Sequence, residues 1–442
     1  MRCSGPRDGD GTRRWGLGRA GLVWAVAVSA YVVSVMHRTS FGVSGVSAAD
    51  RFGVPPDLLA SFVFLQVAVY LGMQVPAGLL VDRFGSRALI TVGSVVMGVG
   101  QGLLAVAASL PLVYVGRFVV GAGDALIFVS TLALLPRWFP APQVPLFTQL
   151  TGTTGQLGQL LSAVPFLALL QAAGWATAHV AAAAVGLFVG ILVLAVVRDA
   201  PYGHTSPVPS LALREIGRAL AGVWRRPGTR LGYFAHMGTQ FSGMVFGLMW
   251  GVPYLVEGQG LSNAEAGVTM AVFVGATVAF APLMGVFAAR HPLRRSWLVL
   301  AVIAATVVAW TAVLALEHPA PPWLLLLLVV VLGAGGPGSV VGFDFARTFN
   351  ERQRLGLAQS VVNLGGFTAT LVVLQLVGWV MAASGGYTFE AFRVAWLVQY
   401  PVWALATAGI LVQRRRTRAV LAAQGVQPRR LRDMVRARRT RG

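Results

Sequence analysis

Residues 78–87 read GLLVDRFGSR and lie between two strongly apolar stretches, 58–80 and 88–110. A helix needs about 20 apolar residues to cross the hydrocarbon core of a bilayer, and both neighbours meet that length. The charged residues between them would then lie at a membrane surface. The stretch therefore predicts two membrane-spanning helices joined by a short polar turn.

The same pattern continues along the whole chain of 442 residues, of which 56% are hydrophobic and only 11% are charged. A soluble domain carries about a quarter charged residues, so this chain is too apolar to fold in water. We therefore predict an all-α membrane protein with twelve transmembrane helices. The predicted spans are 19–43, 58–80, 88–110, 111–135, 145–169, 174–197, 229–254, 264–288, 296–316, 323–346, 356–383 and 391–412.

The longest polar interruption between spans, 198–228, divides the twelve spans into two groups of six. We expect an N-terminal six-helix bundle, 19–197, and a C-terminal six-helix bundle, 229–412, with this central loop between them. Polar tails are expected at the two ends, 1–18 and 413–442.

The two halves resemble each other in sequence. GLLVDR at 78–83 corresponds to GVFAAR at 285–290, an offset of 207 residues, and RWFP at 137–140 corresponds to RTFN at 347–350, an offset of 210. Similar offsets at two places indicate duplication of a six-helix unit, with pseudo-two-fold symmetry between the bundles. Transporters built from such repeats bind their substrate at the interface of the halves, near the middle of the membrane.

The charge distribution predicts the orientation. All 35 basic residues are arginine, and 31 of them fall in segments that lie on one side of the membrane if the N-terminus is cytoplasmic. The positive-inside rule then places both termini in the cytoplasm of a cell inner membrane. Because the net charge of +20 is spread over separate membrane-edge segments, we expect no nucleic-acid binding. The basic tail 413–442 is expected to lie on the anionic lipids of the inner leaflet, or else to serve only as a topogenic tail.

Residues 78–87 resemble the motif G-x-L-x-D-R-x-G-R-R that joins the second and third helices in the major facilitator superfamily. The resemblance implies a twelve-helix transporter that works by alternating access, and it covers nearly the whole span 19–412. The gating residues that it assigns are Gly78, Asp82, Arg83, Gly85 and Arg87.

The chemistry of these residues suits a gate. The carboxylate of Asp82 can accept hydrogen bonds from the start of the eleventh helix, near Gly356, where the helix dipole favours an anion. The resemblance implies that this contact holds the cytoplasmic side shut in the outward-facing state. In the tenth span, Asp344 and Arg347 lie three residues apart and can pair, so we expect them to form a second cytoplasmic gate contact. The second copy of the motif has Ala289 in place of the acid, so any latch there is weaker.

Two ionisable residues lie within the fourth span. Arg117 and Asp124 are seven residues apart, which puts them on one helix face with about 10 Å between them along the axis. Ionised groups are costly inside a membrane, so both are functional candidates. We predict that Asp124 carries the coupling proton, because burial favours the protonated form of a carboxyl. The alternative is that Asp124 is hydrogen-bonded to a hydroxyl group on a neighbouring helix.

The first span ends with His37 and Arg38. If Arg38 and Arg117 both face the cavity, they favour an anionic substrate such as an organic acid, a nitrate-like anion or a phosphate ester. The alternative for Arg38 is that its side chain extends to the outer headgroups. The alternative for His37 is a purely packing or hydrogen-bonding role.

Three further polar residues in the second half are candidates for substrate contacts, or else for hydrogen bonds between helices: His236, Gln240 and Asn363. Residues 363–366 read NLGG and resemble the signature of the nitrate transporters in the superfamily. That group also has an arginine within the second helix and another within the eighth, which this chain lacks. Nitrate is therefore not the favoured substrate.

The sequence favours a proton-coupled transporter of a small solute and leaves two alternatives open. A drug/proton antiporter for cationic or lipophilic compounds remains an alternative, although Gln156 stands where such exporters usually have a proline. A non-transporting sensor or scaffold of the same fold is a second alternative. An enzyme is not expected, because the six histidines lack metal-ligand spacing and the absence of lysine rules out a G-x-x-x-x-G-K loop. We expect no cofactor and no metal, and a monomeric chain.

Overall fold

The computed structural model describes residues 17–44, 48, 51–53, 56–201, 213–385, 387–423 and 425. Most of the predicted N-terminal tail, part of the predicted central loop and most of the predicted C-terminal tail therefore lie outside the described residues. Within the described ranges the regular structure consists of helices, without strands.

The first half of the molecule contains the helices of the predicted N-terminal bundle. They are α1 (Leu17–Val43), α3 (Pro56–Gly72), α4 (Gln74–Ala105), α5 (Leu110–Trp138), α6 (Val144–Gly155), α7 (Leu157–Leu161), the π-helix η1 (Ser162–Phe166) and α8 (Leu167–Val196). Two of them contain sharp breaks at glycines with positive φ, Gly85 in α4 (φ 82°) and Gly174 in α8 (φ 80°). Each break lies at the boundary between two predicted spans. The breaks occur at glycine because only glycine adopts this backbone conformation without strain.

The second half follows a helix that lies within the predicted central loop, α9 (Leu213–Arg225). Its elements are α10 (Pro227–Val245), η2 (Phe246–Trp250), α11 (Gly251–Pro253), η3 (Tyr254–Gly258), α12 (Asn263–Arg290), η4 (Pro292–Arg294), α13 (Arg295–Leu314), α14 (Pro322–Gly333), α15 (Gly335–Phe349), η5 (Arg352–Arg354), α16 (Leu355–Ala383), α17 (Phe389–Ala395), η6 (Trp396–Val398) and α18 (Gln399–Ala423). The last helix continues eleven residues past the predicted end of the twelfth span at 412.

Nine helical runs within the described residues are long and apolar enough to cross a membrane. One of them, Val144–Val196, has 53 residues, which is enough for two crossings at 1.5 Å per residue. The shorter helix α3 and the run from α10 to η3 occupy two further predicted spans. Each of the twelve predicted spans thus has a helix, and the predicted all-α membrane fold is confirmed.

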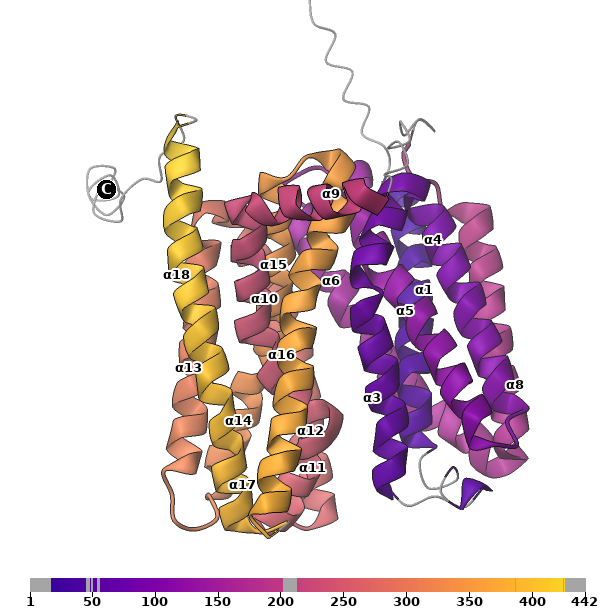
Figure 1. Ribbon diagram of the computed structural model, residues 1–442, viewed down its shortest axis with the longest axis vertical. Helices are drawn as coiled ribbons and strands as arrows, with labels where there is room; N and C mark the ends of the chain where they lie inside the picture. The colour runs from indigo at the N-terminus through magenta and orange to yellow at the C-terminus, as the bar shows by residue number, and fades with distance from the viewer. Residues whose placement is uncertain are drawn as a thin grey trace, which may run out of the picture.

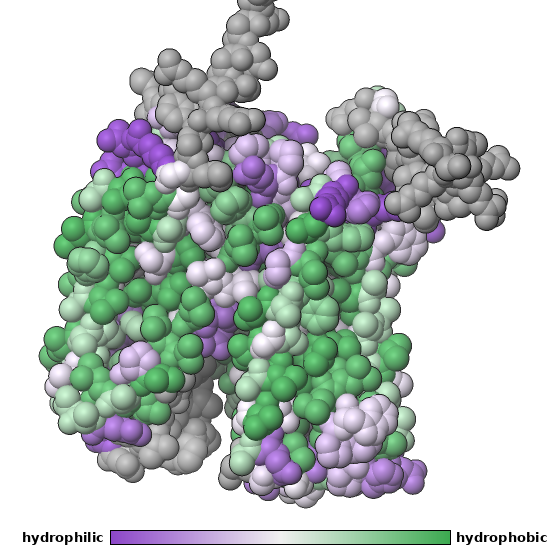
Figure 2. All heavy atoms as spheres, turned by 180° about the vertical axis from the view of Figure 1, so that it is seen from behind, coloured by the Kyte–Doolittle hydropathy of each residue, from purple (hydrophilic) through white to green (hydrophobic). Residues whose placement is uncertain are grey.

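The halves stand side by side as two helical bundles (Figure 1). Helix α9 lies across one end of the molecule, which we call the α9 end, whereas α17 lies at the opposite end, which we call the far end (Figure 1). Figure 2 shows apolar side chains over the middle of both bundles, hydrophilic ones gathered near the two ends, and a notch between the bundles that opens at the far end. The exposed apolar band is the surface that lipid covers.

Two large clusters of buried apolar side chains form the core. One lies within the second half and includes Trp310 and Trp396. The other fills the first half and continues across to Phe343 and Val361 of α15 and α16, so apolar packing also joins the halves. The candidate site lies between the same two halves.

Candidate functional site

A cavity of 440 Å³ lies between the two halves. Helices α1, α3, α5, α6 and α7 line it from the first half, and α10, α12, α14, α15 and α16 line it from the second. Its polar lining residues are Tyr31, Arg38, Thr39, Gln66, Tyr70, Gln149, Thr153, Gln156, Gln159, His236, Gln240, Thr277, Ser339 and Asn363. Among the described residues that line it, Arg38 is the one with a formal charge at neutral pH.

Arg38 forms an ion pair across the first half with Asp124. Its Nε lies 2.7 Å from Oδ2 and its Nη2 lies 2.9 Å from Oδ1, so the pair is bidentate. Asp124 also accepts a hydrogen bond from the hydroxyl of Ser34. The Arg38 side chain is 16% exposed and that of Asp124 only 1%, so the arginine shields the carboxylate from the cavity. A charge inside a membrane is expected to have a partner, and each of these two charges supplies the other's partner.

The other two candidates near this pair lie outside the cavity lining. Arg117 is fully buried, with its guanidinium 4.8 Å from the ring centroid of Phe41. Its Nη2 approaches the carbonyl oxygen of Arg38 at 3.4 Å, while its Nε and Nη1 have no hydrogen-bond partner among the described residues. His37 is also fully buried, and its Nε2 lies 2.9 Å from the carbonyl oxygen of Ala182 in α8. Both side chains belong to the interior of the first bundle.

Four lining residues carry buried polar atoms without a partner in the described structure. These atoms are both amide atoms of Gln66, Oε1 of Gln149, Nδ1 of His236 and Oε1 of Gln240. Gln66 comes from the first half, and His236 and Gln240 come from successive turns of α10 in the second. Buried polar groups in proteins are almost always hydrogen-bonded, so these atoms mark where a polar ligand or water fits.

The cavity is closed toward the α9 end by contacts between the halves. The amide nitrogen of Asn363 in α16 donates to the hydroxyl of Tyr70 and to Oε1 of Gln74, each at 2.9 Å. The rings of Tyr70 and Phe367 lie 4.7 Å apart between centroids. Asn363 therefore both lines the cavity and ties the halves together.

Asp82 lies two turns beyond Gln74 toward the α9 end and, like Gln74, joins α4 to α16. Its Oδ1 accepts a hydrogen bond from the backbone N–H of Gly356 at 2.8 Å, and its Oδ2 accepts one from Leu357 at 2.9 Å. The motif at 78–87 predicts this contact with the start of the eleventh helix. Gly78 lies one turn further in, where a Cβ atom would come within 2.8 Å of the Cα of Leu357. Glycine is needed at this position because α4 and α16 come too close together to leave room for a side chain.

The remaining residues of the motif act within the first half. Gly85 breaks α4, and the carboxylate of Asp199 caps the new helix start by accepting from the N–H groups of Ser86 and Arg87 at 2.5 and 3.0 Å. Arg87 also donates to the carbonyl oxygen of Leu194. The guanidinium of Arg83 lies 4.7 Å from the neighbouring Phe84 ring.

Asp344 and Arg347 pair as the spacing predicts, with Nη2 of Arg347 3.2 Å from Oδ1 of Asp344. Arg295 of α13 approaches the same carboxylate at 3.9 Å. All three groups belong to the second half, so this cluster does not itself join the bundles. Its gating role stays a prediction.

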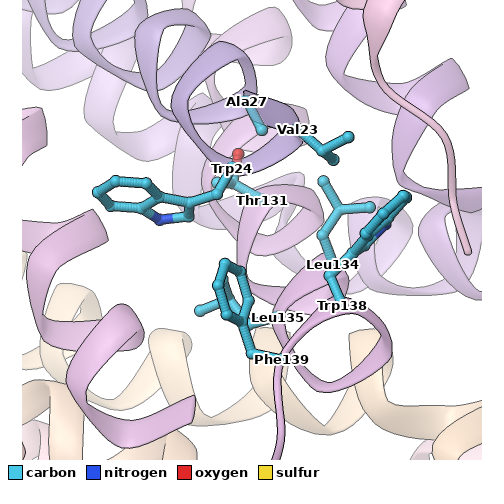
Figure 3. Close-up of a pocket in the computed structure, with 8 residues that line it drawn as sticks. All are labelled: Val23, Trp24, Ala27, Thr131, Leu134, Leu135, Trp138 and Phe139. Carbon is cyan, nitrogen blue, oxygen red and sulfur yellow. The ribbon is translucent and has the colours of Figure 1, made fainter. Parts of the chain in front are cut away.

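A second, smaller pocket lies between α1 and the end of α5 (Figure 3). Its lining residues are Val23, Trp24, Ala27, Thr131, Leu134, Leu135, Trp138 and Phe139. The two indole N–H groups are used elsewhere, since Trp24 donates to Thr151 at 2.9 Å and Trp138 donates to the carbonyl of Arg198 at 2.8 Å. These eight described lining residues include no charged side chain, so the central cavity is the better candidate for binding a polar solute.

The sequence model of the major facilitator superfamily matches residues 27–251 and 231–441. The chain belongs to the major facilitator superfamily. It is therefore a membrane transporter and not an enzyme, as the motif at 78–87 predicts.

Three relatives within the superfamily carry functional names. The chain is 26% identical to a probable sulfoacetate transporter of Cupriavidus necator, over 61% of this chain and 65% of that protein, so the match spans slightly less than two thirds of the relative's length. It is 22% identical to a putative tartrate transporter of Agrobacterium vitis, over 83% and 85%. It is 28% identical to a probable nitrate/nitrite transporter of Mycobacterium tuberculosis, over 68% and 75%.

Two solved structures share the fold. The transporter FucP in its outward conformation aligns with a TM-score of 0.63 at 16% identity, over 89% of this chain and 97% of that one. A bacterial homologue of the iron transporter ferroportin, in an outward-facing state, aligns with a TM-score of 0.68 at 13% identity, over 88% and 99%. At these identities the likeness shows the fold alone.

The site residues predicted from the sequence do not include Gln66, Tyr70 and Gln74, although their regular spacing could have indicated them. These residues precede Gly78 and Asp82 at a constant spacing of four, so each side chain lies about one helical turn from the next. Gln66 and Tyr70 line the cavity, and Gln74, Gly78 and Asp82 meet α16. Asp199 had no such signal, because its role depends on the break at Gly85.

Proposed function

We propose that the chain is a secondary transporter that moves a small organic or inorganic anion together with protons across the bacterial inner membrane. The observation that carries this proposal is the Arg38–Asp124 pair, with Arg38 presented to a cavity between the two halves. Substrate binding at that interface is the arrangement expected for a transporter with two repeated halves.

The residues that line the cavity favour a negatively charged substrate. Nε and Nη2 of Arg38 point to Asp124, and the 16% exposure of the Arg38 side chain keeps part of its guanidinium open to a ligand in the cavity. Guanidinium groups bind carboxylates, sulfonates and related oxyanions through paired N–H donors. The names of the three relatives, for sulfoacetate, tartrate and nitrate/nitrite, all denote anions. On the opposite wall, His236 and Gln240 can hold a second polar group of the same solute.

The ion pair also supports proton coupling. With the cavity empty, Asp124 is the counter-ion of Arg38. When an anion binds Arg38, two negative charges would share one arginine, which is costly in a membrane. A proton on Asp124 removes the excess charge, leaves Arg38 to the substrate, and comes off again as the anion leaves. Each bound anion is thereby linked to one proton on Asp124.

Orientation and alternating access complete the proposal. The helix ends and turns at the α9 end carry several arginines, so the positive-inside rule favours a cytoplasmic position for this end. They include Arg83, Arg137, Arg226, Arg290 and Arg354. The Asp82 contact closes that end, while the notch between the halves opens at the far end (Figure 2). We infer an outward-facing state, from which release of the Asp82 contact leads to the inward-facing one, in a monomeric transporter.

Flux into proteoliposomes tests the proposal. Sulfoacetate, tartrate and nitrate would be offered alongside a neutral sugar and a cationic dye, with and without an inside-alkaline pH gradient. We expect at least one anion to accumulate only with the gradient. In Asp124→Asn, gradient-driven accumulation should fall by at least about tenfold while exchange of external for internal anion persists, because the variant still binds anion but carries no proton.

The control is Arg393→Gln, which removes an arginine at the far end, outside the cavity. Accumulation by Asp124→Asn at the wild-type level would refute the coupling role. Movement of the sugar or the dye but of no anion would refute the anionic substrate. A cation exporter would need an acidic group facing the cavity, and the described lining residues include none.

A further inference from the structure

The end of α18 carries four arginines on a helix that extends past its neighbours at the α9 end (Figure 1). They are Arg414, Arg415, Arg416 and Arg418. The predicted twelfth span ends before them, so they lie where a lipid headgroup layer meets water. Helical spacing of 100° per residue puts Arg414 and Arg418 on one flank of α18 and Arg416 on the other.

The flank with Arg414 and Arg418 faces α13. Lower on the same two helices, the hydroxyls of Tyr400 and Thr311 lie 2.8 Å apart, which shows that α18 and α13 run side by side. At the α9 end, the guanidinium of Arg414 lies 4.2 Å from the ring centroid of Trp297, the third residue of α13. Stacking on an aromatic ring holds the planar guanidinium in one orientation.

Among the described residues, no carboxylate forms an ion pair with either of these two arginines. Nε of Arg414 is buried and without a hydrogen-bond partner, and Arg418 lies close enough to repel it electrostatically. The ion pairs within the described residues use other arginines, so none neutralises this flank. Residues 426–442 hold seven arginines and one aspartate, so the following chain adds positive charge.

The surface beneath the two arginines is apolar and exposed. Trp297 is 53% exposed, Val308 is 67% exposed three turns further along the same face of α13, and Leu411 is 41% exposed on the Arg414 flank of α18. A tryptophan at this depth is typical of the boundary between headgroups and acyl chains. Cationic groups above an apolar surface match an amphiphile with a negatively charged head.

We propose that the surface where α13 and α18 run side by side binds one anionic phospholipid at the α9 end, with Arg414 and Arg418 holding its phosphate and Trp297 orienting Arg414. Two guanidinium groups suit the phosphodiester of a lipid such as phosphatidylglycerol. The acyl chains lie along the exposed face of α13. The proposal requires that the chain spans a membrane and is independent of which solute it transports.

Thermal unfolding of the purified full-length protein in detergent micelles tests the proposal, with phosphatidylglycerol, phosphatidylcholine or inorganic phosphate added. A ligand that prefers the folded state raises the midpoint. We expect phosphatidylglycerol to raise it and the other two to leave it unchanged. The double variant Arg414→Gln/Arg418→Gln should need about tenfold more phosphatidylglycerol for the half-maximal shift.

The matched control is Arg415→Gln/Arg416→Gln, which removes the same charge from the same two turns of α18 and should respond almost as the wild type does. Trp297→Leu, which keeps every arginine, guards against a folding defect in the double variant and should also weaken the response. If both double variants lose the response to phosphatidylglycerol equally, the effect comes from general surface charge and the proposal is overturned. An equal response to inorganic phosphate would also overturn it, and so would a wild-type response of Arg414→Gln/Arg418→Gln.

Discussion

The halves meet along two helix pairs that occupy corresponding places in the two repeats, α4 against α16 and α12 against α6. At the first pair, a Cβ on Gly78 would lie 2.8 Å from the Cα of Leu357, the third residue of α16. At the second, a Cβ on Gly285 would lie 3.1 Å from the Cα of Leu146, the third residue of α6. We call these the first and the second seam. The repeat therefore reproduces the backbone contact almost residue by residue.

The seams differ in their polar chemistry. In the first, Asp82 lies one turn beyond Gly78 and accepts from the N–H groups of Gly356 and Leu357. In the second, the corresponding acceptor position is Ala289, and the residue that corresponds to Gly356 is Pro145, which has no N–H. The second seam thus lacks both the acceptor and one donor.

Two copies of the same backbone contact can therefore contribute unequally to closing the α9 end. The first seam is held by a charged hydrogen bond acceptor, whereas the second is close-packed. The hydrogen bond that Gln149 of α6 donates, to the carbonyl oxygen of Pro337 at 2.7 Å, goes to α15 and not to α12. We expect the first seam to decide whether the α9 end is open, and the second to slide with it.

The largest effect should follow loss of the carboxylate. Asp82→Ala leaves two N–H groups at the start of α16 without their acceptor, and hydrogen bonds to charged groups contribute about 1.5–3 kcal/mol each. We expect the closed state of the α9 end to lose about 100-fold in population relative to the open state. Pulsed electron spin resonance between labels at Ala141 in the loop before α6 and Arg415 in α18, in a Cys3→Ser background, would show a longer distance across this end.

The control is Asp199→Ala, because Asp199 caps a helix start within the first half. It should lower thermal stability and leave the label distance unchanged. If Asp82→Ala keeps the wild-type distance, the first seam does not depend on its carboxylate, and the contrast between the seams has no functional meaning.

A smaller effect should come from adding one methyl group to each seam. Gly78→Ala places a carbon 2.8 Å from Cα of Leu357 and 2.9 Å from the carbonyl oxygen of Gly356, so backbone must move, at a cost of about 1–3 kcal/mol. Gly285→Ala meets its nearest atoms at 3.1 and 3.2 Å, which a shift of a few tenths of an ångström relieves. The same label pair should therefore report opening for Gly78→Ala and little change for Gly285→Ala. Equal responses would mean that the seams are packed alike.

Sequence alone predicted the first seam and not the charge pair in the cavity, for a physical reason. Asp82 and Gly356 lie at helix ends, where a short loop and a helix start fix their depth in the membrane before any packing is known. The pairing of Asp124 with Arg38 depends on how α1 and α5 rotate against each other. The spacing of seven between Arg117 and Asp124 indicated a shared face, but the structure turns Arg117 onto Phe41 and brings Arg38 to the carboxylate.

The end of α18 was also beyond the sequence pattern. Hydropathy falls at Arg414, which set the predicted boundary at 412, yet the backbone stays helical to Ala423. Arginine is a good helix former, and its long side chain reaches the headgroup layer without ending the helix. A boundary drawn from hydropathy marks the end of the apolar stretch and not the end of the helix.

The smallest expected effect is a stabilisation of the closed α9 end, produced by rebuilding the polar contact of the first seam in the second. Ala289→Asp alone adds an acceptor that faces Pro145, and Pro145→Ala alone adds a donor without an acceptor, so neither single change should move the label distance. Together they rebuild the polar contact of the first seam in the second. We expect the double variant to favour the closed α9 end by about 1 kcal/mol, a population change of about fivefold. A double-mutant cycle on the fraction closed measures this coupling directly. A coupling of zero would show that the missing carboxylate and the proline do not account for the difference between the seams, and that the helix start at Val144 lies too far from position 289 for a latch.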